Sequence, residues 1–180
     1  MITGKQYAEQ AKSPKYDRLT YENTDCQKFA ETVLKDCGVR KDNGTVYDWK
    51  GSNSMWRNGL LWKGNIEECI ATYGEIPEGA WVFIHAYDGG EVERGYHDNE
   101  GNAKHVGIYV GGDDPNKMVR DSTRSRTRDG VGYRKLEGFN MVGLPYMIDY
   151  SVSVQTPTRT ITRAEALEAL QTLTNYIKGV

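Results

Sequence analysis

The stretch from Thr24 to Gly38, TDCQKFAETVLKDCG, decides the fold because it encodes one long amphipathic helix near the start of the chain. Each helical residue advances about 100° around the axis, so apolar residues at helical spacing share one side. The apolar side chains on that side are Phe29, Ala30, Val33 and Cys37. The pattern predicts a helix over Asp25–Cys37 that packs this side on another layer.

Both ends of the stretch carry helix signals. Thr24 and Gln27 have the spacing of a reciprocal capping box, and Gly38 is a typical C-terminal stop. Cys26 falls on the apolar side in the first turn. A thiol there lies at the positive end of the helix dipole, which favours the thiolate. Cys26 is therefore a candidate nucleophile, and a buried structural thiol is the alternative.

Beyond this helix the pattern changes from helical to extended. Two short helices are expected, around Ser54 and over Asn65–Thr72. After the turn EIPEGA come short β-branched and aromatic segments separated by Gly, Asp and Asn, as in an antiparallel meander. These segments are AWVFIHAY, HVGIYVGG, KMVRDST, VGYRKL and FNMVGLPYMIDY. Helices first and strands later indicate an α+β fold, with the cysteine-bearing helix across an antiparallel sheet.

Length and charge limit the domain organisation and the partners. Of the 180 residues, we expect 1–150 to form one domain, 151–162 a linker and 163–180 an amphipathic helix. With 23 basic and 25 acidic side chains the net charge is -2, which argues against a nucleic-acid partner. There is no run of about 18 apolar residues, so no membrane span is expected, and the first residues lack the apolar core of a secretory signal.

A thiolate nucleophile needs a base, and the chain offers His85, His97 and His105. His97 lies in a polar loop, which favours a surface role, and His85 follows an apolar strand. His105 opens HVGIYVGG, where the two-residue repeat of a strand puts it on one face with Gly107. Gly107 leaves space for another backbone element beside the histidine, and the helix N-terminus that bears Cys26 would fit there.

The imidazole in turn needs a polar group that orients it. KMVRDST is expected to pair with HVGIYVGG through a hairpin at DDPN, which brings Arg120 and Asp121 near His105. A carboxylate accepts the ring N–H, whereas arginine has no acceptor. The residue chemistry therefore favours Asp121 as the orienting residue.

The sequence gives less support to other functions of these residue types, namely disulfides, a metal site or nucleic-acid binding. Three cysteines, an odd number, argue against a disulfide framework. The absence of C-x-x-C, H-E-x-x-H and H-x-E pairs argues against a metal, so none is expected. The basic stretch RDSTRSRTRDG has no interleaved aromatic residues on which nucleic-acid bases would stack. Its arginines, Arg124 among them, suit the carboxylates of an acidic peptide instead.

The motifs DCQKF, IPEGAWVFI and HVGIYVGG, in that order, resemble the NlpC/P-sixty family of papain-like cysteine peptidases. The resemblance implies a papain-like fold with Cys26 as nucleophile and His105 as general base. It also implies a polar orienting residue on the next strand, at Asp121 or Arg120 depending on one gap. A tyrosine ahead of the cysteine borders the site in this family. The candidates for that position are Tyr21 and Tyr16.

The family cleaves peptide stems of bacterial cell walls, commonly between D-glutamate and a diamino acid, without a metal or organic cofactor. The resemblance thus implies a peptidoglycan stem peptide as partner. Without a secretory signal, it implies synthesis in the cytoplasm and action at the wall as a phage or prophage protein, or a leader already removed.

The usual Asp-Cys-Ser-Gly is replaced here by Asp-Cys-Gln-Lys. A wall-binding or assembly module without turnover, or a thiol amidase or acyltransferase, is therefore the alternative. The sequence leaves the oligomeric state open.

Overall fold

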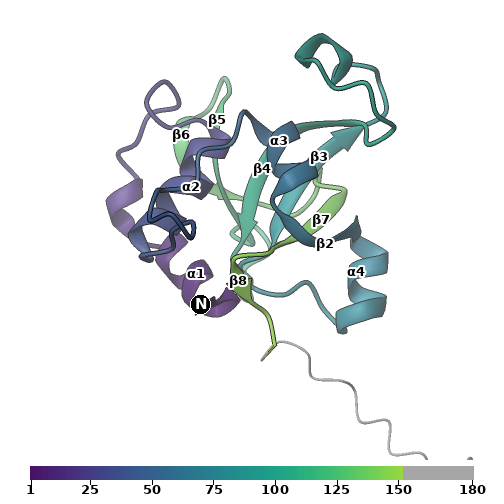
Figure 1. Cartoon of the computed structure of the whole chain (residues 1–180). Coiled ribbons are helices and arrows are strands. Elements are labelled where there is room, and N and C mark those ends of the chain that lie inside the picture. Colours follow the sequence, from purple (N-terminus) through teal and green to yellow (C-terminus); the bar gives the residue numbers. More distant parts are fainter. Residues whose placement is uncertain (152–180) are drawn as a thin grey trace, which may run out of the picture.

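The computed structural model describes residues 1–151 (Figure 1). The predicted C-terminal helix over 163–180, and the expected linker from residue 152 onward, lie outside the described residues. The helices are α1 Gly4–Ala11, α2 Cys26–Asp36, α3 Ser52–Asn58 and α4 Ile66–Tyr73, with 3-10 turns at Pro14–Tyr16 and Val92–Arg94. Within the described part of the chain, no helix has the length and apolar character that crossing a membrane requires.

The strands form a six-stranded antiparallel sheet and a separate two-stranded parallel pair. In the large sheet the order is β2-β7-β3-β4-β5-β6, and β1 pairs with β8. The strands are β1 Ile2–Thr3, β2 Leu60–Asn65, β3 Trp81–Ala86, β4 Asn102–Tyr109, β5 Val119–Arg124, β6 Asp129–Arg134, β7 Met141–Pro145 and β8 Ile148–Asp149. Strands β3 to β6 are the predicted meander. Strand β2 was not predicted, and β7 leaves the meander order to lie between β2 and β3.

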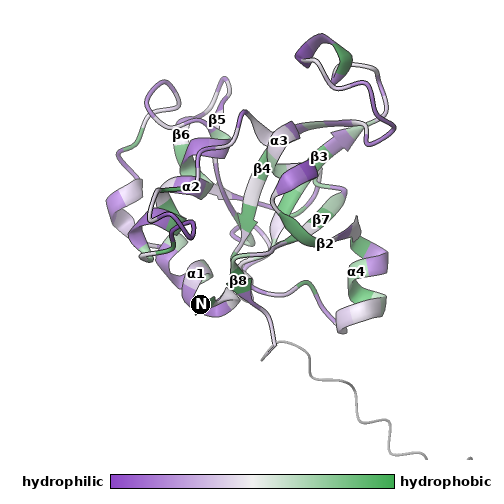
Figure 2. Ribbon diagram, in the orientation of Figure 1, coloured by the Kyte–Doolittle hydropathy of each residue, from purple (hydrophilic) through white to green (hydrophobic). Residues whose placement is uncertain are grey.

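The core lies between the sheet and the N-terminal helices, which confirms the α+β class (Figure 1). Trp81 of β3 donates its indole N–H to the hydroxyl of Tyr7 in α1 at 3.1 Å, and that hydroxyl donates to the Ala30 carbonyl in α2 at 3.0 Å. All three residues are buried. Apolar residues are concentrated on the strands, and the outer loops are mostly polar (Figure 2). One buried hydrogen-bonded chain therefore fixes α1 and α2 to the sheet.

Helix α2 agrees with the predicted Asp25–Cys37, because these two residues are its N-cap and C-cap. The predicted capping box was wrong by one position. The Asp25 carboxylate, not the Thr24 hydroxyl, accepts a helix N–H, that of Lys28 at 2.8 Å. An aspartate is as good an N-cap as a threonine, so the choice is made by tertiary contacts. Thr24 is buried and its carbonyl accepts the hydroxyl of Ser122 in β5.

Candidate functional site

Helix α2 places its first residue, Cys26, against the middle of the sheet. The Ser122 hydroxyl of β5 holds the backbone just before the helix, and the Asp25 cap fixes its first turn. The Cys26 residue is 9% exposed. It lies near the His105 imidazole of β4, because Cys26 is one of the groups that raise the pKa of that ring. The structure thus brings together the two residues that the sequence analysis paired.

Asp121 of β5 completes the cluster. His105 Nε2 and Asp121 Oδ2 are 2.6 Å apart, with 12% of the histidine side chain exposed and none of the aspartate side chain. The strands pair with Ile108 opposite Arg120. Because successive strand residues point to opposite faces, this register puts His105 and Asp121 on the same face. The imidazole therefore has a thiol and a buried carboxylate as partners.

These contacts control the protonation of the site. Burial lowers the pKa of His105, but the hydrogen bonds and charges of Asp121 and Cys26 outweigh it and raise the pKa from 6.5 to about 9. Burial would raise the pKa of Asp121, but His105, Arg128 and Arg134 together hold it below the ordinary 3.8. At neutral pH the pair is an imidazolium and a carboxylate. A positive charge beside a thiol favours the thiolate.

Asp121 has two further partners that the sequence did not predict. Arg128 Nη2 donates to Asp121 Oδ1, and Arg134 Nη1 donates to Asp121 Oδ2 at 3.2 Å. Arg128 also donates to the Tyr133 carbonyl at 3.0 Å. A run of arginines in a hairpin is usually solvated, so the sequence did not mark Arg128 and Arg134 as partners of Asp121. The available signal was a buried carboxylate, since a buried charge needs cationic or hydrogen-bonding partners.

Two glycines make room for this convergence. A Cβ on Gly107 of β4 would lie 3.3 Å from the Asp121 Cβ and 2.5 Å from the Val119 side chain. A Cβ on Gly132, which pairs with Asp121 from β6, would lie 2.5 Å from Nη1 of Arg128. The Arg120 carbonyl of β5 also lies 3.4 Å from the Cβ position of Gly107, so the backbone element beside Gly107 is the adjacent strand and not the helix N-terminus. Side chains of β5 occupy the space, because the adjacent strand is closer than the helix.

Arg120, the other candidate for the orienting position, faces the helices. Its Nε donates to the Ala11 carbonyl at 3.2 Å and its Nη2 to Asp17 at 2.6 Å. It is 1% exposed and lies over the Tyr133 ring. Strand alternation separates it from the face that carries Asp121. Arg120 therefore binds the helical layer, and of these two residues only Asp121 lies at the imidazole.

Tyr21 and Arg124, the predicted substrate-binding residues, lie together, and the charge of Cys26 acts on Tyr21. The Arg124 guanidinium is 5.4 Å from the centre of the Tyr21 ring. Burial first, and then the charges of Cys26 and Asp25, raise the pKa of the Tyr21 hydroxyl. Tyr16, the alternative to Tyr21, is buried and donates to Asp36 at 2.8 Å. The geometry therefore places Tyr21 at the site border.

The remaining cysteines and histidines lie elsewhere. Burial raises the pKa of Cys37 and of Cys69 to about 11. His97 is exposed. His85 is buried and its Nε2 lies 2.7 Å from the Glu100 carbonyl, and burial lowers its pKa. Within residues 1–151, no group of three or more His, Cys, Asp or Glu side chains is placed to hold a metal ion.

Gln27, which stands where the resemblance leads us to expect serine, fixes a neighbouring loop. Its amide donates to Glu31 at 2.9 Å and to the Trp49 carbonyl, and its carbonyl accepts the Gly51 N–H. Glu31 accepts the Trp49 N–H. This pair, one helical turn apart, ties the segment before α3 to α2. The substitution therefore has a structural role close to Cys26, which the sequence did not reveal.

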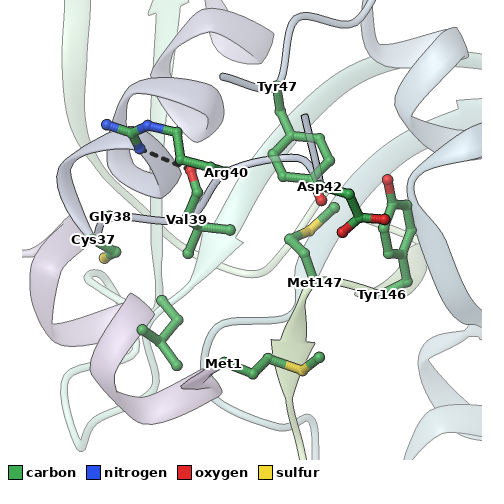
Figure 3. Close-up of a pocket in the computed structure, with 10 residues that line it drawn as sticks. Met1, Cys37, Gly38, Val39, Arg40, Asp42, Tyr47, Tyr146 and Met147 are labelled. Atoms are coloured by element: carbon green, nitrogen blue, oxygen red, sulfur yellow. Dashed lines mark hydrogen bonds between the residues drawn. The ribbon is translucent and has the colours of Figure 1, made fainter. Parts of the chain in front are cut away.

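A hollow of about 560 Å³ lies at the opposite end of α2, past Cys37 (Figure 3). Met1, Tyr47, Tyr146 and Met147 line it, and Arg40 at its rim donates to the Val39 carbonyl at 2.8 Å. An α-helix rises about 1.5 Å per residue, so the length of α2 separates this hollow from Cys26. It takes no part in the cluster around His105.

Comparison with protein-family models, with curated proteins and with solved structures finds no match to this chain.

Proposed function

We propose that the protein is a cysteine peptidase with Cys26 as nucleophile, His105 as general base and Asp121 as the orienting residue. The observation that carries the proposal is an imidazole held by a buried carboxylate, with a thiol at a helix N-terminus near enough to raise the pKa of that imidazole. A helix dipole and an adjacent imidazolium are the two devices that activate a thiol at neutral pH. Both meet at one sulfur atom here.

The reaction proceeds through an acyl-enzyme. The Cys26 thiolate attacks the carbonyl carbon of the scissile amide and forms a C–S bond. The tetrahedral intermediate collapses with loss of the C–N bond, and the His105 imidazolium gives its proton to the departing amine. His105, now neutral, takes a proton from water. The hydroxide adds to the thioester, and the acid leaves with regeneration of the thiolate and imidazolium.

The oxyanion is stabilised at the same helix end. Helix geometry leaves the first N–H groups of α2 without carbonyl partners, and the Asp25 cap satisfies that of Lys28. The N–H of Cys26 remains to donate to an oxygen that develops negative charge next to the sulfur. The Tyr21 hydroxyl, at the border of the site, can add a second donor.

We further propose an NlpC-type, papain-like fold and a substrate among the peptide stems of bacterial cell walls, cut between D-glutamate and a diamino acid. The order of the motifs DCQKF, IPEGAWVFI and HVGIYVGG supports this. Arg124 over Tyr21 adds a guanidinium at the site border for the free carboxylate of such a stem. That substrate implies action at the cell wall, either as a phage or prophage protein or as a secreted protein.

Digestion of purified cell-wall peptides, with mass analysis of the fragments, tests the proposal. The wild type releases fragments cut at the D-glutamyl bond, Cys26→Ala releases none, and Cys37→Ala, the matched control, retains the wild-type rate. Hydrolysis that survives in Cys26→Ala would exclude thiol catalysis. Binding to the wall without release by the wild type would favour the alternative of a binding module.

A further inference from the structure

A second hollow, of about 480 Å³, lies on the β5–β6 hairpin beside Asp121. Its lining is Thr123, Ser125, Thr127, Arg128, Tyr133 and Arg134. Two guanidinium groups and four hydroxyl groups therefore surround it, and no lining side chain is acidic. Guanidinium groups only donate hydrogen bonds, and hydroxyl groups can donate. The lining has the chemistry of an anion-binding site.

The arginines have donors to spare. Each guanidinium has five N–H groups, and the bonds to Asp121 and to the Tyr133 carbonyl use only part of them. Nε of Arg128 is buried and has no hydrogen-bond partner among the residues that the structure describes. Buried polar groups are nearly always paired, so the cluster holds more donors than the chain supplies acceptors. An oxyanion would correct this imbalance.

The net charge of the cluster is positive, which also favours an anion. Arg128, Arg134 and the His105 imidazolium contribute three positive charges. Asp121 contributes one negative charge, and Cys26 as a thiolate would contribute a second. At least one positive charge remains. Because 21% of the Arg128 side chain and 32% of the Arg134 side chain are exposed, water screens that charge only in part.

We propose that this hollow binds an oxyanion, a carboxylate or a phosphate group, through Arg128 and Arg134, and that binding is coupled to His105. The same two arginines hold Asp121. A bound anion competes with Asp121 for the two arginines. The charge of Asp121 is then less neutralised by them and stabilises the His105 imidazolium more strongly. Coupling is reciprocal, so a protonated His105 strengthens anion binding. The site does not depend on the peptidase reaction for its existence.

The test is a titration of isotope-labelled protein, followed by NMR, with inorganic phosphate and separately with glutarate at constant ionic strength. We expect saturable shifts confined to backbone amides of 123–134. Arg134→Gln weakens binding about tenfold or more, the effect of losing a hydrogen bond to a charged group. The control is Arg126→Gln, an exposed arginine of the same hairpin outside the described lining, which changes affinity less than about twofold.

The two probes separate the possible ligands. Tighter binding of glutarate indicates a carboxylate site and tighter binding of phosphate a phosphate site. In either case the His105 ring signals titrate at higher pH when the site is saturated. If Arg134→Gln does not fold, Thr123→Val, which removes one hydroxyl at nearly constant volume, must weaken binding severalfold. Shifts that do not saturate, or equal losses in the Arg126 and Arg134 variants, would overturn the proposal.

Discussion

At the residue scale, Asp121 determines the electrostatics of the site. It is fully buried, so its charge is stable only with partners, and residues 1–151 supply three: His105, Arg128 and Arg134. The arginines share the negative charge, which limits how far Asp121 can raise the pKa of His105. An orienting carboxylate of this kind is tuned by residues that do not touch the thiol.

The first prediction concerns the three thiols. Iodoacetamide at pH 6.5 should alkylate Cys26 at least about tenfold faster than Cys37 or Cys69, because thiolates react and thiols do not. Burial raises the pKa of the other two thiols to about 11, so almost none of either is ionised. Peptide mass mapping of timed samples measures the three rates. In His105→Ala, the Cys26 rate should fall toward those of the others, and equal rates in the wild type would contradict an activated thiol.

Residue chemistry alone predicted the pairing of His105 with Asp121 and its neighbour Cys26, because donor and acceptor types and strand alternation limit the choices. It could not predict Arg128 or Arg134. Their partnership depends on Gly132, whose missing Cβ leaves the space that Arg128 crosses. From sequence alone, a glycine in a strand indicates only a weakened strand. Its role as space for a neighbouring side chain is visible only in the structure.

At the element scale, β6 holds the segment that leads into α2. The Val131 N–H donates to the Leu19 carbonyl at 3.1 Å. This contact requires Gly130, where φ is +119° and a Cβ would lie 2.0 Å from the Leu19 oxygen. The backbone before Cys26, including Tyr21, is thus positioned from the far edge of the sheet.

The second prediction is that Gly130→Ala lowers the free energy of unfolding by about 2 kcal/mol or more, from a strained φ together with a backbone clash. Chemical denaturation measures the change. Gly112→Ala is the matched control, because its φ is +100° but nothing lies within 4 Å of the added Cβ. It should lose only about 1 kcal/mol. Equal losses in the two variants would show that the clash with Leu19 contributes nothing to the change in the free energy of unfolding.

Elements with local signals were predicted well. Helix α2 and the meander β3 to β6 have periodic sequences and connect neighbours in space. Strand β2 and the position of β7 were not predicted, because β7 pairs with β2, more than sixty residues earlier, as with Lys63 opposite Gly143. No local pattern records such a pairing. The capping error has a similar cause, since Asp25 and Thr24 are equivalent as caps until Ser122 of β5 binds the Thr24 carbonyl.

At the scale of the whole molecule, β5 joins the structural core to the site. Arg120 and Ser122 bind the segments around α1 and before α2 on one face of the strand. Asp121, between them in sequence, faces the imidazole on the other. A shift of β5 would therefore move Cys26 and Asp121 together. This arrangement predicts that the stability of the fold and the ionisation of the site are linked.

The third prediction gives that link a pH window. The pKa of His105 is about 9 in the folded chain and 6.5 ordinarily. A raised pKa means that the folded state holds the proton more tightly, so this stabilisation is complete below pH 6.5 and is lost as the pH rises through 9. The free energy of unfolding should fall over this window by an amount on the order of 2 kcal/mol. Chemical denaturation at a series of pH values measures it.

Other titratable groups change the free energy of unfolding outside this pH window, or a control variant distinguishes their effect from that of His105. The lowered pKa of His85 removes stability only below pH 6.5, and the raised pKa values of Cys37 and Cys69 remove it above about pH 9. His105→Gln should therefore flatten the profile between pH 6.5 and 9. His97→Gln, at an exposed histidine, should keep the wild-type slope. A wild-type profile that is already flat in this range would mean that the imidazolium has no stabilising partners, and the proposed pairing of His105 with Asp121 and Cys26 would have to be abandoned.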